Sequence, residues 1–220
     1  MLAHNYFTSS IGKKQILALT GLGLLGFTVT HLAGNFFLFV GADAFNKYAY
    51  TLTSNPLIYV AEAGLIGMFL LHVVLALVLK TENHSARPVK YYNKTRTGRG
   101  ETIASATMPI TGVIILVFII LHLLNFKFGA HYTTNVAGTE MRDLYRVVIE
   151  YFASPLYVAW YCFAVCALGL HTSHGVQSVF QTWGFNHKSY TPHIKTAGVL
   201  YGLFVAIGLS SLAIFCHFQN

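Results

Sequence analysis

The stretch LIYVAEAGLIGMFLLHVVLALVL, residues 57–79, decides the fold class of this chain. Apart from Tyr59, its only ionisable side chains are those of Glu62 and His72, and the remaining residues are apolar or small. A helix crosses the ~30 Å hydrocarbon core of a bilayer with about 20 apolar residues, because each residue adds ~1.5 Å. The stretch therefore predicts a transmembrane helix.

Four further apolar stretches of similar length occupy residues 16–40, 108–126, 156–176 and 194–215. The chain is 55% hydrophobic and only 10% charged, which is typical of a membrane protein. The first stretch is longer than the apolar region of a cleavable signal peptide, so we expect it to be retained. Prolines stand near the starts of the second to fifth stretches, where a missing N–H costs least; they are Pro56, Pro109, Pro155 and Pro192. We predict an all-α fold, a single integral membrane domain over residues 1–220 with five transmembrane helices.

The formal net charge is +7, and the basic residues lie in short segments between the apolar stretches. This distribution indicates membrane topology and argues against nucleic-acid binding. Ten of the 14 Lys and Arg residues fall on one side: Lys13, Lys14, Lys80, Arg87, Lys90, Lys94, Arg96, Arg99, Lys188 and Lys195. The other four are Lys47, Lys127, Arg142 and Arg146. The excess predicts a cytoplasmic N-terminus and an outside C-terminus, in a multi-pass protein of the bacterial inner (cytoplasmic) membrane.

Two loops and the cysteines carry further predictions. Residues 80–107 form the most basic loop, which is either a topology signal that also attracts anionic lipid or a docking surface for a cytoplasmic partner. The outer loop, residues 127–154, is long enough for a short amphipathic helix near residues 141–152. The three cysteines form no C-x-x-C pair, which argues against disulfides, attached c-type haem and cysteine-bound iron–sulfur clusters.

Each of the first four predicted helices contains a histidine, namely His31, His72, His122 and His171. An ionisable residue inside a bilayer is costly and marks a functional site. Helices one and three enter from the cytoplasm, and His31 lies about 17 residues, or roughly 25 Å, into the first. His122 lies at a similar, outer depth. Helices two and four enter from outside, so they place His72 and His171 at a shared inner depth.

Two histidines at one depth on separate helices can bind a planar macrocycle from both axial sides. We therefore predict two b-type haems, an outer one on His31 and His122 and an inner one on His72 and His171. Filled axial positions favour electron transfer over oxygen binding. His174 lies on nearly the same face as His171, but its place nearer the interface favours contact with the haem propionates. Two other interpretations stay open: isolated interhelical hydrogen-bonding residues, or the lining of a proton or metal pathway.

Other residues are candidates for contact with the haems. Gly21 and Gly112 at inner depth, and Gly64 and Gly67 at outer depth, leave room for a porphyrin edge, although small residues are common at any membrane helix interface. Propionates of the inner haem need cations or donors near the cytoplasmic surface. The residues available there are Ser10, Lys14, Ser178 and Gln181.

Motifs around all four histidines, spread over nearly the whole chain, carry a family resemblance. They are HLAGN (31–35) with DAFNKY (43–48), His72 followed by EN (82–83) and ARP (86–88), HLLNFKFG (122–129), and HTSHG (171–175) with SVFQTWG (178–184). Together they resemble the cytochrome b membrane-anchor subunit of succinate dehydrogenase and fumarate reductase, of the five-helix dihaem type.

The resemblance implies a membrane anchor for a flavoprotein (FAD) subunit and an iron–sulfur subunit on the cytoplasmic side, in a complex that is monomeric or dimeric. The chain would relay electrons between a membrane quinone and the iron–sulfur subunit without touching the dicarboxylate. Menaquinone is the quinone that the dihaem type implies. Two alternatives are the dihaem cytochrome b of a hydrogenase or formate dehydrogenase, and a haem-free, histidine-lined transporter.

Quinone chemistry moves protons together with electrons, so a quinone pocket needs a group that exchanges protons. Glu62 is the only carboxylate within the apolar stretches, and it is the candidate for this exchange. The alternative is a solvated carboxylate at the interface. Helix four has no acidic residue beside His171, so a transmembrane proton path along it lacks an obvious carrier.

Overall fold

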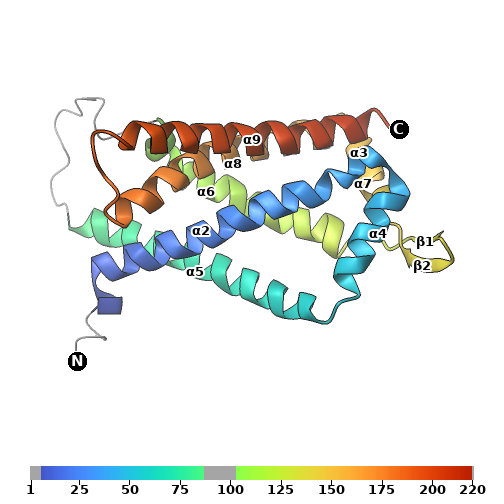
Figure 1. Ribbon diagram of the computed structural model, residues 1–220, viewed down its shortest axis with the longest axis horizontal. Coiled ribbons are helices and arrows are strands. Elements are labelled where there is room, and N and C mark those ends of the chain that lie inside the picture. Colours follow the sequence, from blue (N-terminus) through green and yellow to red (C-terminus); the bar gives the residue numbers. More distant parts are fainter. Residues whose placement is uncertain (1–5, 87–102, 220) are drawn as a thin grey trace.

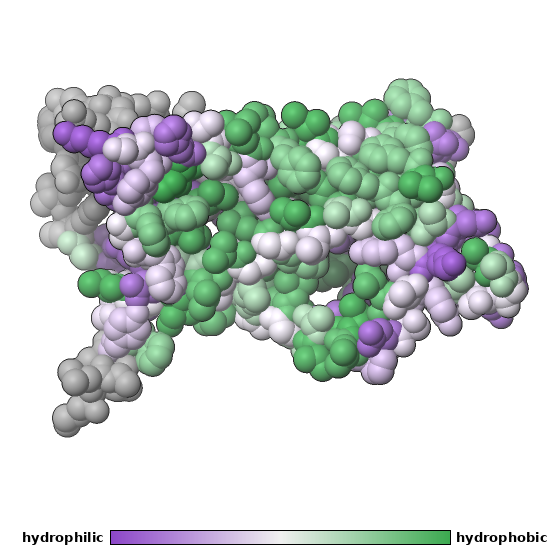
Figure 2. Space-filling model, viewed as in Figure 1, coloured by the Kyte–Doolittle hydropathy of each residue, from purple (hydrophilic) through white to green (hydrophobic). Residues whose placement is uncertain are grey.

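The fold is that of a computed structural model, which describes residues 6–86 and 103–219. Within these residues five helical spans are long and apolar enough to cross a membrane. They are α2 (Ser10–Asn35), which continues past a break at Phe36 as α3 (Phe37–Val40); α5 (Leu57–Ser85); α6 (Ile103–His122), which continues as the π-helical segment η1 (Leu123–Lys127); α8 (Pro155–Thr182); and α9 (Thr191–His217). Consecutive spans run in opposite directions, so α2 begins and α9 ends at opposite ends of the bundle (Figure 1). Figure 2 shows hydrophobic side chains across the middle of the bundle and hydrophilic ones gathered toward its ends.

The spans extend beyond the apolar stretches of the sequence, mostly at the end of the bundle where α2 begins. The stretch at 57–79 lies in α5, which ends at Ser85, and the stretch at 156–176 lies in α8, which ends at Thr182. Polar residues continue a helix after it leaves hydrocarbon, and hydropathy does not register them. The expectation that Pro109 stands near a helix start is wrong, because α6 begins at Ile103 and holds this proline in its interior.

The tightest packing in the bundle joins α8 to α9 through glycines. A Cβ on Gly169 would lie 2.6 Å from the carbonyl oxygen of Gly202, and one on Gly202 would lie 2.3 Å from that of Gly169. Gly198 meets the Ser173 carbonyl in the same way, at 2.5 Å. Small residues let the two backbones approach closely, as is usual between helices in a membrane. α9 carries none of the four histidines and serves as a support for α8.

Four short elements form a cap at the end of the bundle away from the start of α2 (Figure 1). They are α4 (Ala42–Thr53), β1 (Thr133–Val136), β2 (Thr139–Arg142) and α7 (Leu144–Phe152). α7 confirms the predicted amphipathic helix and buries Val147, Val148 and Phe152. Asn46 of α4 is 1% exposed; its amide donates to Asp143 Oδ1 at 2.8 Å and its oxygen accepts from the Tyr145 N–H at 2.9 Å. The buried side chain of Asn46 therefore joins α4 to the start of α7.

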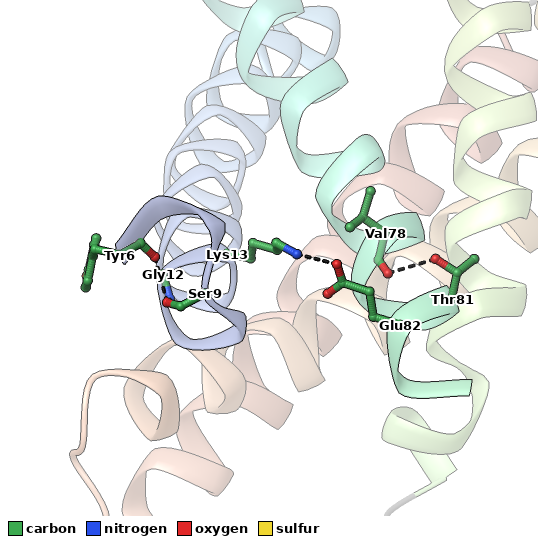
Figure 3. Close-up of polar contacts among 7 residues, drawn as sticks. All are labelled: Tyr6, Ser9, Gly12, Lys13, Val78, Thr81 and Glu82. Carbon is green, nitrogen blue, oxygen red and sulfur yellow. Dashed lines mark hydrogen bonds and ion pairs between the residues drawn. The ribbon is translucent and has the colours of Figure 1, made fainter. Parts of the chain in front are cut away.

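α5 is the most peripheral span. It packs extensively against α2 alone among the described elements. An ion pair ties it at each end: Glu82 to Lys13 of α2, drawn in Figure 3, and Glu62 to Lys127 of η1. Near the first pair, the Ser9 hydroxyl accepts from the Gly12 N–H at 3.0 Å and so caps the start of α2.

The most basic part of the sequence lies outside the described residues. It falls within residues 87–102 and includes Arg87, Lys90, Lys94, Arg96 and Arg99. The two interpretations of that loop, a topology signal and a docking surface, therefore stay predictions.

Candidate functional site

The outer pair consists of His31 on α2 and His122, the last residue of α6. Their ring centroids lie 5.7 Å apart, with the ring planes at 79°. Aromatic rings surround both: Phe27 stacks on His31 at 5.3 Å, and Phe118 lies 5.6 Å from His122. The structure thus brings together the two histidines that the sequence places at one depth, near the end of the bundle that carries the β1–β2 hairpin.

The inner pair consists of His72 on α5 and His171 on α8, nearer the end where α2 begins. Their ring centroids lie 6.5 Å apart, with the ring planes at 64°. A hydroxyl approaches Nδ1 of each ring, Thr20 Oγ1 at 3.2 Å from His72 and Thr111 Oγ1 at 3.1 Å from His171. The two pairs are separate, and each joins two different helices.

Each inner ring also lies against a glycine. A Cβ on Gly21 would lie 3.4 Å from Cε1 of His72, and a Cβ on Gly112 would lie 3.7 Å from Cε1 of His171. These glycines are close to the rings, as their depth in the sequence suggests. The predicted outer glycines, Gly64 and Gly67, would place a Cβ with no described atom within 4 Å, so the space beside them is open to a further group.

Each level offers two imidazoles as metal ligands. In the described part of the chain no third His, Cys, Asp or Glu joins either pair to form a three-residue metal site. A bare zinc ion takes three or four protein ligands, whereas a haem brings four nitrogens of its own and needs protein ligands only on its axis. Two imidazoles on opposite sides of one metal ion, each about 2 Å from it, have ring centres about 6 Å apart. Both donor pairs fit a haem.

A cavity of about 290 Å³ opens between the start of α2 and the end of α8. Its polar lining includes three of the residues expected to meet haem propionates, Lys14, Ser178 and Gln181. Ser10 is exposed and lies outside this lining, and His174 is half-buried and also outside it. The Nδ1 of His174 is a buried polar atom without a hydrogen-bond partner among the described residues.

Glu62 lies on the second turn of α5 and forms an ion pair with Lys127, the last residue of η1. Both side chains are partly exposed, at 35% and 42%. A π-helical turn departs from the regular helical phase and often marks a functional site. Here the π-helical turn follows His122 directly and ends at Lys127. One short segment therefore connects the outer histidine pair to the lysine that pairs with Glu62.

The sequence did not single out Thr20, Thr111 or Lys127. A signal for the threonines does exist, because a Thr-Gly dipeptide occurs at inner depth in both helices one and three, at residues 20–21 and 111–112. From the sequence, Lys127 contributes only a positive charge at the start of a loop. Its pairing with Glu62 depends on a π-helical turn, which no residue pattern in this segment reveals.

Comparison with known proteins places these features in a family. Residues 85–215 match the family of succinate dehydrogenase/fumarate reductase transmembrane subunits. The curated succinate dehydrogenase cytochrome b558 subunit of Bacillus subtilis (strain 168) is 27% identical over 202 residues, which cover 90% of this chain and 92% of that protein. No solved structure matches the chain at a significant level. The family match spans more than half of the chain, and it shows that this multi-pass membrane protein belongs to the succinate dehydrogenase/fumarate reductase transmembrane subunits.

Proposed function

We propose that this subunit binds two b-type haems and relays electrons between a membrane quinone and the catalytic subunits of its complex. His31 and His122 hold the outer haem, and His72 and His171 hold the inner one. The observation that carries the proposal is the meeting of four membrane histidines as two facing pairs, at 5.7 and 6.5 Å between ring centroids. The relative from Bacillus subtilis is itself named a cytochrome b558 subunit.

A haem with two imidazole ligands supplies one-electron oxidation and reduction and has no open position for oxygen. The chain's own residues hold and shield this group. Four helices supply the imidazoles, and the aromatic rings of Phe27 and Phe118 cover the outer pair. Lys14, Ser178 and Gln181 bind the propionates of the inner haem at the cavity that they line.

The catalytic partners are a flavoprotein subunit and an iron–sulfur subunit, docked at the end of the bundle where α2 begins. The excess of Lys and Arg in the segments at that end supports a cytoplasmic location for it. With five spans, the C-terminus then lies outside. In this orientation the inner haem is the one nearer the iron–sulfur subunit.

The quinone is menaquinone, and Glu62 exchanges protons with it near the outer pair. A carboxylate at this depth can take up or release a proton as the quinone is oxidised or reduced. The Glu62 carboxylate forms an ion pair with Lys127, and both side chains are partly exposed, so Glu62 can be reached from the surface of the bundle.

The test is a reduced-minus-oxidised optical spectrum of the purified complex, with His31→Ala, His122→Ala, His72→Ala and His171→Ala compared in turn. We expect two b-type haems in the wild type. Substitutions at His31 and His122 should remove the same haem, and those at His72 and His171 the other. Absence of a b-type α-band in the wild type would refute haem binding, and loss of different haems within one pair would refute the pairing.

A further inference from the structure

Thr20 and Thr111 make the same contact at the two inner histidines. Thr20 reaches across from α2 to His72 on α5, and Thr111 reaches from α6 to His171 on α8. Both threonines are buried, at 7% and 4% exposed. The same contact thus occurs twice, once between α2 and α5 and once between α6 and α8. Both histidines of the inner pair share it.

The direction of these hydrogen bonds follows from the single proton of a threonine hydroxyl. Each hydroxyl also meets carbonyl oxygens of its own helix. Thr20 Oγ1 donates to Leu17 at 2.9 Å, and Thr111 Oγ1 lies 3.1 Å from the carbonyls of both Thr107 and Met108. With its proton engaged there, the hydroxyl oxygen faces the imidazole as an acceptor. Nδ1 of the ring must then carry the proton and donate it.

We propose that Thr20 and Thr111 are positioning residues that hold His72 and His171 in the tautomer with the proton on Nδ1. Nε2 of each ring is then the nitrogen with a free lone pair, the one that binds iron. This inference rests on the proposed inner haem. A metal-binding imidazole that donates its other N–H is fixed in orientation and becomes a stronger electron donor.

The outer pair lacks this arrangement at one of its two rings. Nδ1 of His122 is buried and has no hydrogen-bond partner among the described residues. Both rings of the inner pair therefore have a hydroxyl at Nδ1, whereas His122 of the outer pair has none in the described part of the chain. Stronger donation from the inner ligands stabilises the oxidised iron there, so loss of a threonine hydroxyl raises the midpoint potential of the inner haem and leaves that of the outer haem unchanged.

The experiment is a redox titration of the purified complex, with electron paramagnetic resonance of each oxidised haem. Thr111→Val keeps the shape of the side chain and removes the hydroxyl, and Thr111→Ser restores the hydroxyl. The matched control is Thr172→Val, because the buried Thr172 hydroxyl donates to carbonyls of its own helix, Leu168 at 2.8 Å and Gly169 at 3.2 Å.

We expect Thr111→Val to favour reduction of the inner haem up to about tenfold, which is about 59 mV for a one-electron couple. Its resonance spectrum should change too. Thr111→Ser and Thr172→Val should match the wild type in both measurements. Thr20→Val tests the opposite ligand and should shift the same haem, so the inference stays testable if Thr111→Val fails to assemble.

An unchanged inner-haem potential in both valine variants would overturn the proposal. So would an equal shift in Thr172→Val, or a failure of Thr111→Ser to restore the wild-type value. These outcomes differ from a failure of the proposed function. If the wild type had no haem, or if His72→Ala and His171→Ala retained the inner haem, then the haem assignment itself would be wrong.

Discussion

Lys127 reaches from the π-helical turn after His122 to form an ion pair with Glu62 on α5. This contact places a charged lysine beside the only carboxylate of the apolar stretches, at the level of the outer pair. Glu82, at the other end of α5, forms the equivalent ion pair with Lys13 of α2. The two carboxylates therefore differ in position along the helix, although both are paired with a lysine.

Glu62→Gln should slow electron transfer between succinate and a menaquinone analogue by about 10²-fold or more, because positioned proton transfer contributes that much. Succinate oxidation by a soluble dye that bypasses the membrane subunit should stay normal. Glu82→Gln is the matched control, since it breaks an ion pair on the same helix at the other end of the bundle, and should keep quinone turnover. Quinone rates within twofold of the wild type for Glu62→Gln would remove this residue from the mechanism.

Lys14→Met should lower the midpoint potential of the inner haem, because a cation near the propionates stabilises the reduced form. Lys14 is exposed, so the effect is that of a screened surface pair, about a 1.4-fold to fivefold change in the reduction equilibrium. Lys13→Met changes the net charge equally and serves as the control, because the Lys13 charge is directed to Glu82. Equal shifts in the two variants, measured by redox titration, would contradict a specific propionate contact.

Asn46→Ala should destabilise the cap formed by α4, β1, β2 and α7 by about 1–3 kcal/mol, since it removes a buried side chain that bonds both the Tyr145 N–H and Asp143 Oδ1. Thermal denaturation of the purified complex measures this loss. Lys47→Ala, one residue along α4 and exposed, should stay within about 0.5 kcal/mol of the wild type. If Asn46→Ala left the thermal stability unchanged, then the hydrogen bonds of Asn46 would not be needed to hold the cap.

Gly169→Ala should cost about 1–3 kcal/mol, because the new methyl group meets the rigid backbone carbonyl of Gly202. Gly175→Ala on the same helix should be harmless, since its Cβ would have no described atom within 4 Å. Unfolding in mixed detergent micelles compares the two variants. If both behaved alike, then close contact between α8 and α9 would not be needed for stability.

The meeting of the histidines could be predicted from sequence because depth in a membrane is a nearly one-dimensional quantity. A helix that enters at a known surface fixes the height of each residue at ~1.5 Å per position. Charges in the loops supply the entry side. Those two facts were enough to bring His31 to His122 and His72 to His171.

The rotation of a helix about its axis was much harder to predict. Apolar residues surround these helices on all sides, so hydropathy does not show which face meets a neighbour. The reach of Thr20 and Thr111 toward an imidazole, and of Lys127 toward Glu62, depends on that rotation. For the same reason, height alone could not show which of the five propionate candidates share one cavity: Lys14, Ser178 and Gln181 line it, and Ser10 and His174 do not.

The outer cap was also only partly predictable. The amphipathic pattern revealed α7, but the hairpin turns at Ala137, where φ is 52°, and Gly138, where φ is 84°. Alanine seldom adopts a positive φ, so only Gly138 followed the usual residue pattern of such a turn, and the hairpin was not predicted. α4 was missed because its 12 residues are too few to span a membrane.

The peripheral position of α5 has a consequence for how the protein is assembled. Moving this helix aside separates it from α2 and breaks the ion pairs of Glu62 and Glu82, but it leaves the glycine contacts between α8 and α9 intact. His72 travels with it, while His171 remains in place. One histidine of the inner pair is thus carried on the helix that has the fewest neighbours among the described spans, and the other is carried on the helix with the closest backbone contact to its neighbour, so the distance between the two rings depends on how firmly α5 is held against α2.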